Sequence, residues 1–259
     1  LWPVVVLVLC FLVAPSLLIV PMSFSAGDYL QFPPEGLSLR WHAEVAQSQG
    51  WRDALSVSLR VAFANVGVSL VLGLSAAYGL MNWQSRWRDL VFGVLLTPII
   101  FPVILLAIGS FYVYAKLGLL DTLTGLILAH SALALPVVLV MLTAALSNVD
   151  LNQEKAARVL GASRLRAFID ITLPQIRFAL FSAGLFAFLT SFDEVVVTLF
   201  ISGGEATTLT KRMFTALRDV MDPTVAAIST WVLVLTCAAL VVVQLAPNRR
   251  ARSAQPEIE

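Results

Sequence analysis

The sequence has little charge and no cysteine pair at a metal-binding or redox spacing. Only 13% of its 259 residues are Asp, Glu, Lys or Arg, whereas 59% are hydrophobic and the mean hydropathy is +0.87. Cys10 and Cys237 lie far apart, and no metal cluster is expected. A soluble domain of this length has no core large enough to bury so much apolar surface. The chain is therefore predicted to be an integral membrane protein.

The sequence lacks the motifs that are typical of several functional classes. There is no glycine-rich phosphate-binding loop and no nucleophile–base arrangement, so the chain is not expected to be an enzyme. No basic stripe with interleaved aromatics appears, which argues against nucleic acid as a partner. The net charge of +1 gives no further indication, because only its distribution along the chain is informative.

Apolar stretches long enough to cross a bilayer, which takes about 20 helical residues, occur six times in the sequence. Because backbone groups cannot stay unpaired in hydrocarbon, each is expected to be a helix, and strict alternation typical of barrel strands is absent. We predict an all-α bundle of six spans in a membrane domain over 1–246, followed by a polar tail at 247–259. The expected spans are Leu1–Phe24, Asp53–Met81, Leu90–Tyr114, Thr124–Leu146, Arg177–Ser202 and Thr224–Leu245.

The first stretch is expected to be a span and not a signal peptide. Its apolar run exceeds the ~7–15 residues of a signal h-region, and no basic n-region precedes it. Because the chain opens at Leu1 and not at Met, we also expect an initial segment before this numbering.

The distribution of Lys and Arg sets the expected orientation. If the first span runs from inside to outside, the inner segments Asn82–Asp89 and Ser147–Ile176 and the tail after Leu245 hold nine of these cations, against six in the outer segments. Both termini are therefore predicted to be cytoplasmic. The inner cations are Arg86, Arg88, Lys155, Arg158, Arg164, Arg166, Arg249, Arg250 and Arg252.

Small residues and prolines punctuate the spans. Gly73 with Ala77, and Ser75 with Gly79, give a small-xxx-small spacing that lets helices approach closely. Pro98, Pro102 and Pro136 are expected to kink or locally open their helices. These features fit ordinary bundle packing or a transport path.

One interior segment, Glu154 to Pro174, is unusually charged. Helix formers run from Leu151 to Leu160 and Gly161 is a natural C-terminal stop. Ser163 is a plausible N-cap for a second helix, Arg164–Ile171, and Pro174 is expected in the first turn of the fifth span. The face formed by Ala156, Ala157 and Leu160 suits a groove on another protein, and a helix lying on the anionic inner leaflet fits the same pattern.

The segment resembles the EAA loop of permease subunits of type I ABC importers, whose pattern is E-A-A, three residues, G, nine residues and I-x-L-P. Lys155 stands where that family has Glu, and Glu154 precedes it. The resemblance implies the six-span fold of those permeases, and a loop (147–176) that docks into a cleft of an ATPase subunit and passes its closure to the membrane helices. The residues expected in this coupling role are Glu154, Lys155, Ala156, Ala157, Leu160, Gly161, Ala162, Ser163, Ile171, Leu173 and Pro174.

The adjacent carboxylates Asp193 and Glu194 interrupt the fifth apolar stretch. Each charge at mid-bilayer costs on the order of 2.5–3.5 kcal/mol, so such groups usually face a cavity, a partner or the bundle interior. Placed on one helix, the two would be ~100° apart. Either they form a buried ion pair with a partner subunit, or one attracts a cationic substrate in the path.

The stretch SFDEVVVTLFISGGEATTL is similar to permeases of the polyamine (spermidine and putrescine) importer group. That likeness implies a polyamine substrate, or another ammonium-bearing solute such as a 4-aminobutyrate-like amino acid or an aminophosphonate. Expected substrate-path residues are His130, Ser191, Asp193 and Glu194, although His130 also fits a buried, hydrogen-bonded helix histidine.

The same resemblance implies the partners and the location. They are a second permease, expected to be a different chain, two ATPase subunits that bind ATP and Mg, and a periplasmic or extracellular substrate-binding protein, all at the bacterial inner membrane. This chain itself is expected to bind no cofactor. A proton-coupled secondary transporter is the main rival, but no inverted repeat is evident. A non-transporting scaffold or channel subunit would leave the EAA-like spacing unexplained.

Overall fold

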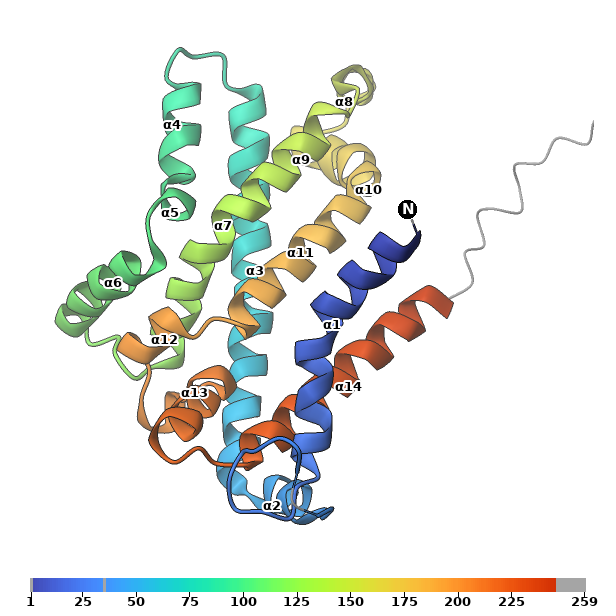
Figure 1. Ribbon diagram of the computed structural model, residues 1–259. Helices are drawn as coiled ribbons and strands as arrows, with labels where there is room; N and C mark the ends of the chain where they lie inside the picture. The colour runs from blue at the N-terminus through green and yellow to red at the C-terminus, as the bar shows by residue number, and fades with distance from the viewer. Residues whose placement is uncertain (1, 35, 246–259) are drawn as a thin grey trace, which may run out of the picture. The chain divides into compact units, whose positions relative to one another are not determined.

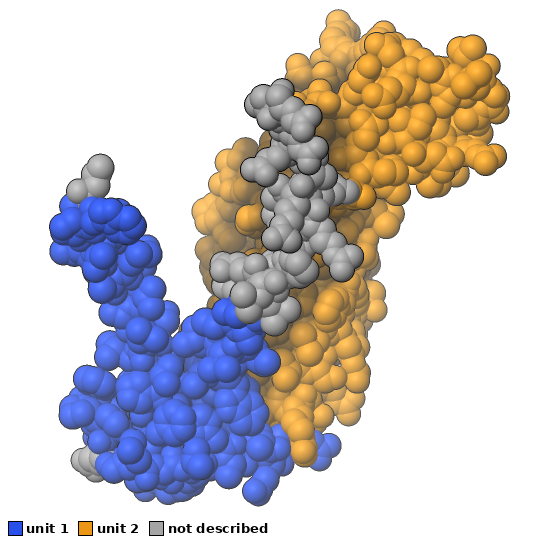
Figure 2. Space-filling model, turned by 90° about the vertical axis from the view of Figure 1, so that its right-hand side faces the viewer, with its two compact units in different colours: residues 1–49, 215–259 blue, residues 50–214 orange. Residues whose placement is uncertain are grey.

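The computed structural model describes residues 2–34 and 36–245, and their regular structure is helical. The chain divides into two compact units, residues 1–49 with 215–259 (unit 1) and residues 50–214 (unit 2), coloured separately in Figure 2. The polar tail predicted at 247–259 lies outside the described residues.

Unit 1 is built on two apolar helices, α1 (Trp2–Ser23) and α14 (Thr224–Leu245), which run side by side (Figure 1). The short helix α2 (Arg40–Gln47) also contacts α14. It buries Trp41 and Val45, one turn apart, and the Trp41 indole donates a hydrogen bond to the Gly27 carbonyl at 3.2 Å. Within α1 only Ser23 is buried, so this unit leaves most of the α1 surface to lipid or to a partner.

Unit 2 contains the long helix α3 (Gln49–Asn82) and a series of shorter helices. Helix α7 lies at its centre and packs against α11, α12 and α5. The other helices are α4 (Arg88–Leu95), α5 (Thr97–Ile100), α6 (Val103–Leu117), α7 (Leu123–Ser147), α8 (Leu151–Val159), α9 (Arg164–Ala167), the π-helical turn η1 (Phe168–Thr172), α10 (Leu173–Gln175), α11 (Arg177–Phe192), α12 (Val196–Ile201), the 3-10 turn η2 (Gly204–Ala206) and α13 (Leu209–Asp219), whose last residues belong to unit 1.

Helix covers all six predicted spans, but not all of them are continuous. Among the described residues, α1, α3 and α7 are each long and apolar enough to cross a membrane unaided. Helix α11 meets the criterion together with the bent segment Arg164–Gln175 that precedes it. The third span is opened at Pro98 and Pro102, as those prolines predicted, whereas the expectation of a continuous helix for the fifth span is wrong.

Prolines explain the interruption of the third span. Pro98 opens the short helix α5, and Pro102 is the N-cap of α6. Proline lacks an N–H and forces the preceding residue out of the helical region, so Phe101 is extended, with ψ 142°. Pro136, by contrast, lies buried inside an unbroken α7.

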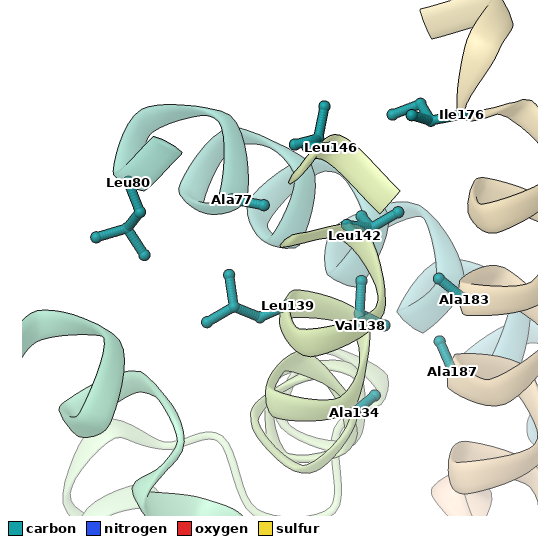
Figure 3. Close-up of a cluster of buried hydrophobic side chains, with 10 residues drawn as sticks. All are labelled: Ala77, Leu80, Ala134, Val138, Leu139, Leu142, Leu146, Ile176, Ala183 and Ala187. Carbon is teal, nitrogen blue, oxygen red and sulfur yellow. The ribbon is translucent and has the colours of Figure 1, made fainter. Parts of the chain in front are cut away.

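A cluster of buried apolar side chains joins α3, α7 and α11 (Figure 3). Leucine and valine side chains of α7 fill the space between small residues on its neighbours, and Ala77, Ala183 and Ala187 let the helices approach closely. The α7 members of the cluster are Ala134, Val138, Leu139, Leu142 and Leu146.

Gly73 allows a close approach of α3 and α7, as its small-residue spacing predicted, whereas nothing lies within 4 Å of the Cβ position of Gly79. A Cβ built at Gly73 would lie 2.6 Å from Cγ1 of Val138 on α7. Nearby on α3, the buried Asn65 side chain donates a 2.7 Å hydrogen bond to the Ala187 carbonyl and accepts one from Ser69. Helix α3 is thus fixed to α7 by packing and to α11 by a buried polar contact.

The segments that connect the helices of unit 2 lie at its two ends. The turn between α3 and α4 and the segment α8–α10 lie at one end of this unit, whereas the α6–α7 turn and α12 lie toward the other (Figure 1). The two inner segments predicted from their cations, Asn82–Asp89 and Ser147–Ile176, therefore share one end of unit 2.

We expect Gly73→Ala to lower the thermal stability of the purified protein in detergent. Val138 is fully buried, so overpacking at this contact costs about 1–3 kcal/mol. Gly67→Ala on the same helix is the control, because nothing lies within 4 Å of its Cβ position. A melting temperature of Gly73→Ala equal to that of Gly67→Ala would contradict the packing described here.

Candidate functional site

The charged segment begins as a well-capped helix. Asp150 caps α8 by accepting a hydrogen bond from the Asn152 amide at 2.9 Å. The helix ends at Val159, one residue earlier than expected, and Gly161 follows with φ +95°, a conformation that favours glycine. Ser163 then caps α9 through the Arg166 amide, as predicted.

The second helix is longer than its sequence suggests. It continues from α9 through the π-helical turn and α10 to Gln175 and then bends by 78° into α11. Pro174 therefore belongs to α10, ahead of the bend, and the expectation that it starts the fifth span is wrong. The reason is that proline is tolerated at the start of α10, while the chain turns at Ile176.

Glu154 holds the loop to the helix bundle. Its side chain is buried, with 6% exposure, although it carries a carboxylate. The hydroxyl of Tyr78 on α3 donates to Glu154 Oε2 at 2.8 Å, and the hydroxyl of the fully buried Thr172 donates to Oε1. The Tyr78 ring packs on Phe168, with centroids 4.6 Å apart, and the Arg164 guanidinium lies over the same ring. These contacts tie α8, η1 and α3 together.

The opposite side of the loop faces outward. Val159 and Leu160, at the end of α8, are 87% and 88% exposed. A groove beside them is lined by Lys155, Arg158, Val159, Ala162, Ser163 and Arg164. Charged and apolar groups are thus presented together at the turn.

The other predicted coupling residues divide between these two sides. Ala156 and Gly161 are exposed with the outward face, and Ala157 is half-buried. Ile171 and Leu173 are half-buried next to Thr172, and Pro174 is exposed. The structure thus brings the predicted residues into one loop with an anchored and an exposed side.

His130 and Ser191 meet in a buried polar contact. His130 on α7 is 1% exposed, and its Nδ1 lies 2.8 Å from Ser191 Oγ on α11. The buried Nε2 atom of His130 and the hydroxyl of Ser131 have no partner among the described residues. The prediction of a buried, hydrogen-bonded helix histidine is confirmed.

Asp193 and Glu194 do not share a helix, so their expected ~100° separation is wrong. Helix α11 ends at Phe192 and α12 begins at Val196. The Glu194 carboxylate accepts a 2.7 Å hydrogen bond from the Val197 amide at the start of α12. Asp193 is exposed, and its carboxylate has no hydrogen-bond or ion-pair partner within the described part of the chain.

Hydroxyl groups stabilise this break in the helix. The Glu194 carbonyl, which a continuous helix would pair internally, accepts hydrogen bonds from Thr198 and Thr210. Because the unwound backbone is satisfied in this way, it tolerates an apolar environment. Over the described ranges, no group of three or more His, Cys, Asp or Glu residues is placed to hold a metal ion.

Sequence reasoning missed Tyr78, Thr172 and Asn65. Thr172 lies between two residues of the EAA-like pattern, and its polarity among apolar neighbours was an available signal. Asn65 is an amide within a long apolar run, which is typical of a polar contact between spans. Tyr78 had no signal of its own, because its role depends on where Glu154 lies.

Comparisons with known proteins agree on one family. The family described as "Binding-protein-dependent transport system inner membrane component" matches residues 69–251. Putrescine transport system permease protein PotI of Escherichia coli strain K12 is 30% identical over 90% of this chain and 85% of its own length. Spermidine/putrescine transport system permease protein PotC of Haemophilus influenzae is 29% identical over 92% of each chain.

A solved structure has the same fold. A chain from a bacterial ABC transporter involved in the import of the acidic polysaccharide alginate superimposes with a TM-score of 0.73, covering 94% of both chains. The two sequences are 16% identical, so this likeness concerns the fold alone.

We expect Thr172→Val to loosen the charged loop. The substitution removes a buried donor from Glu154, which costs about 1–3 kcal/mol and speeds opening of the loop by roughly tenfold or more. Hydrogen exchange of the α8 amides, followed by mass spectrometry, measures this effect. Asp170→Asn is the control, because it breaks only the exposed 3.4 Å pair with Arg166. Equal exchange in the two variants would contradict the anchoring role of Glu154.

Proposed function

The chain belongs to the family of binding-protein-dependent transport system inner membrane components, and on this premise we propose that it carries a polyamine such as putrescine or spermidine into the cell. It is the non-catalytic permease subunit of an ABC importer in the inner membrane. Such a permease works with a partner permease, with ATPase subunits and with a substrate-binding protein. The proposal concerns the substrate, the roles of individual residues and the orientation.

The loop from Leu151 to Gln175 is proposed to couple the ATPases to the membrane helices. The observation that supports this role is its two-sided construction, in which Glu154 is fixed to α3 while Val159 and Leu160 are exposed at the tip. A push on the tip is carried as a rigid-body movement into α3 and, through the bend, into α11. Two ATPase subunits would act on two permeases, and the loop would lie in the cytoplasm together with both termini.

Asp193 is the proposed contact for a cationic substrate. It lies at the C-terminal end of α11, where the helix dipole adds partial negative charge, and its carboxylate is exposed. Ends of interrupted helices within membranes commonly bind cations in transporters. Glu194 is engaged with the Val197 amide, so it is assigned to holding the break in place.

The His130–Ser191 pair is proposed to support the path beside this break. Ser191 lies two residues before Asp193, and its contact with α7 fixes the end of α11. A carboxylate fixed in this way recognises an ammonium group, which polyamines share with 4-aminobutyrate-like amino acids and aminophosphonates. The similarity to PotI and PotC favours a polyamine, and a second permease that is a different chain.

We expect Gly161→Asp to abolish transport while the protein still inserts into the membrane. The φ of +95° disfavours any side chain, and a charged one at the exposed turn obstructs docking. Substrate-stimulated ATP hydrolysis by the assembled complex in proteoliposomes measures coupling.

The matched control is Gly118→Asp, which places the same side chain at a φ of +67° at the end of α6, outside the loop. This variant is expected to keep stimulated hydrolysis. Normal stimulated hydrolysis in Gly161→Asp would refute the coupling role.

We expect Asp193→Asn to lower putrescine uptake by roughly tenfold in kcat/KM without loss of assembly, because a charge contact is lost. Glu194→Gln, which keeps an acceptor for the Val197 amide, should have a smaller effect. Uptake of labelled putrescine into proteoliposomes holding the complex and its binding protein is the measurement, with 4-aminobutyrate as competitor. Unchanged uptake in Asp193→Asn would refute a substrate contact at this residue.

A further inference from the structure

The exposed side of the coupling loop carries charge of one sign. Its groove is lined by the cations Lys155, Arg158 and Arg164, and no acid in the described part of the chain lines it. The nearest acid in sequence, Glu154, is turned inward and accepts hydrogen bonds from two hydroxyl groups. Arg164 lies over the Tyr78 ring, so Lys155 and Arg158 are the cations that this groove offers to a partner.

The two other acids of the loop, Asp150 and Asp170, do not alter that balance, because neither lines the groove. Asp170 pairs with Arg166 at 3.4 Å, four residues away, on the exposed surface of the second helix. Neither residue lines the groove. The charge of Arg166 is therefore already balanced by Asp170, and Arg166 can be used as a control on the same loop.

Apolar surface accompanies the cations. Val159 and Leu160 are the large apolar side chains exposed at the end of α8, and Val159 also lines the groove. A small apolar tip flanked by cations fits a concave partner, whose floor is apolar and whose rim is negative. A helix adapted to lie on a leaflet would instead expose an apolar face along its length, and α8 exposes Asn152, Gln153 and Lys155 before this tip.

We infer that the ATPase subunit that receives this loop offers an acidic cleft, with carboxylates placed against Lys155 and Arg158. This inference rests on the proposed coupling function and specifies its partner. Lys155 provides an electrostatic contact, whereas the neighbouring Glu154 acts inside the permease as a positioning residue. A loop with Glu at position 155 would be expected to meet a basic group on the ATPase, whereas Lys155 is expected to meet an acidic one.

The test is a charge reversal, Lys155→Glu. The full-length chain and its partner permease are reconstituted without ATPase subunits into nanodiscs of phosphatidylcholine. Binding of the purified ATPase subunit of the same importer is measured at low and high ionic strength. We expect affinity at low ionic strength to fall by roughly tenfold, because an attraction becomes a repulsion. The difference between wild type and variant should shrink in high salt, where the charges are screened.

Two controls separate the possible outcomes. Arg166→Glu reverses a cation on the same loop outside the groove and should change affinity much less. If the ATPase binds neither wild type nor variants, the proposed function fails as a whole. If it binds wild type and Lys155→Glu equally, or binds the variant more tightly, the coupling function stands and the acidic cleft is refuted.

A second experiment, which changes the lipid composition, tests whether the cations bind the lipid leaflet and not the ATPase. Phosphatidylcholine carries no net charge, so an effect that persists in those nanodiscs arises from the ATPase. An effect seen only when anionic phosphatidylserine is added would assign the cations to the membrane surface and overturn the inference.

Discussion

A carboxylate removed from water has to be held by donors, and the position of Glu154 decides much else in this chain. The hydroxyls of Tyr78 and Thr172 hold it from two different segments, so α8 is fixed at the same time to α3 and to the π-helical turn. Once that side of α8 is fixed inward, the turn at Gly161 and the tip at Leu160 face outward. The exposed side of the loop is thereby defined by an interaction on its opposite side.

The same requirement, that buried polar groups find partners, governs the break between α11 and α12. Threonine hydroxyls satisfy the Glu194 carbonyl, and the Glu194 carboxylate satisfies an amide of α12. With those groups engaged, Asp193 remains exposed at a helix C-terminus. Interrupted helices thus convert two adjacent carboxylates into one structural and one accessible group.

The fold itself does not select the substrate. It is shared with a transporter involved in importing an acidic polysaccharide, whereas the relatives PotI and PotC are permeases of putrescine and spermidine systems. Selectivity therefore has to come from particular side chains and from the binding protein that delivers the solute. In this chain, the exposed carboxylate of Asp193 marks the break in the fifth span, and the cations mark the exposed side of the loop.

The sequence by itself determined the helical membrane class and the charged loop with its capping residues Gly161 and Ser163, because hydropathy, glycine and cap preferences act locally. Only the tertiary structure showed that the fifth span breaks after Phe192, where the hydroxyl of Thr210, 16 residues away, donates to the Glu194 carbonyl. It also decided that Glu154 is the anchor and Lys155 the exposed neighbour. Their adjacency in sequence left open which would face inward, and the answer depended on Tyr78, 76 residues away.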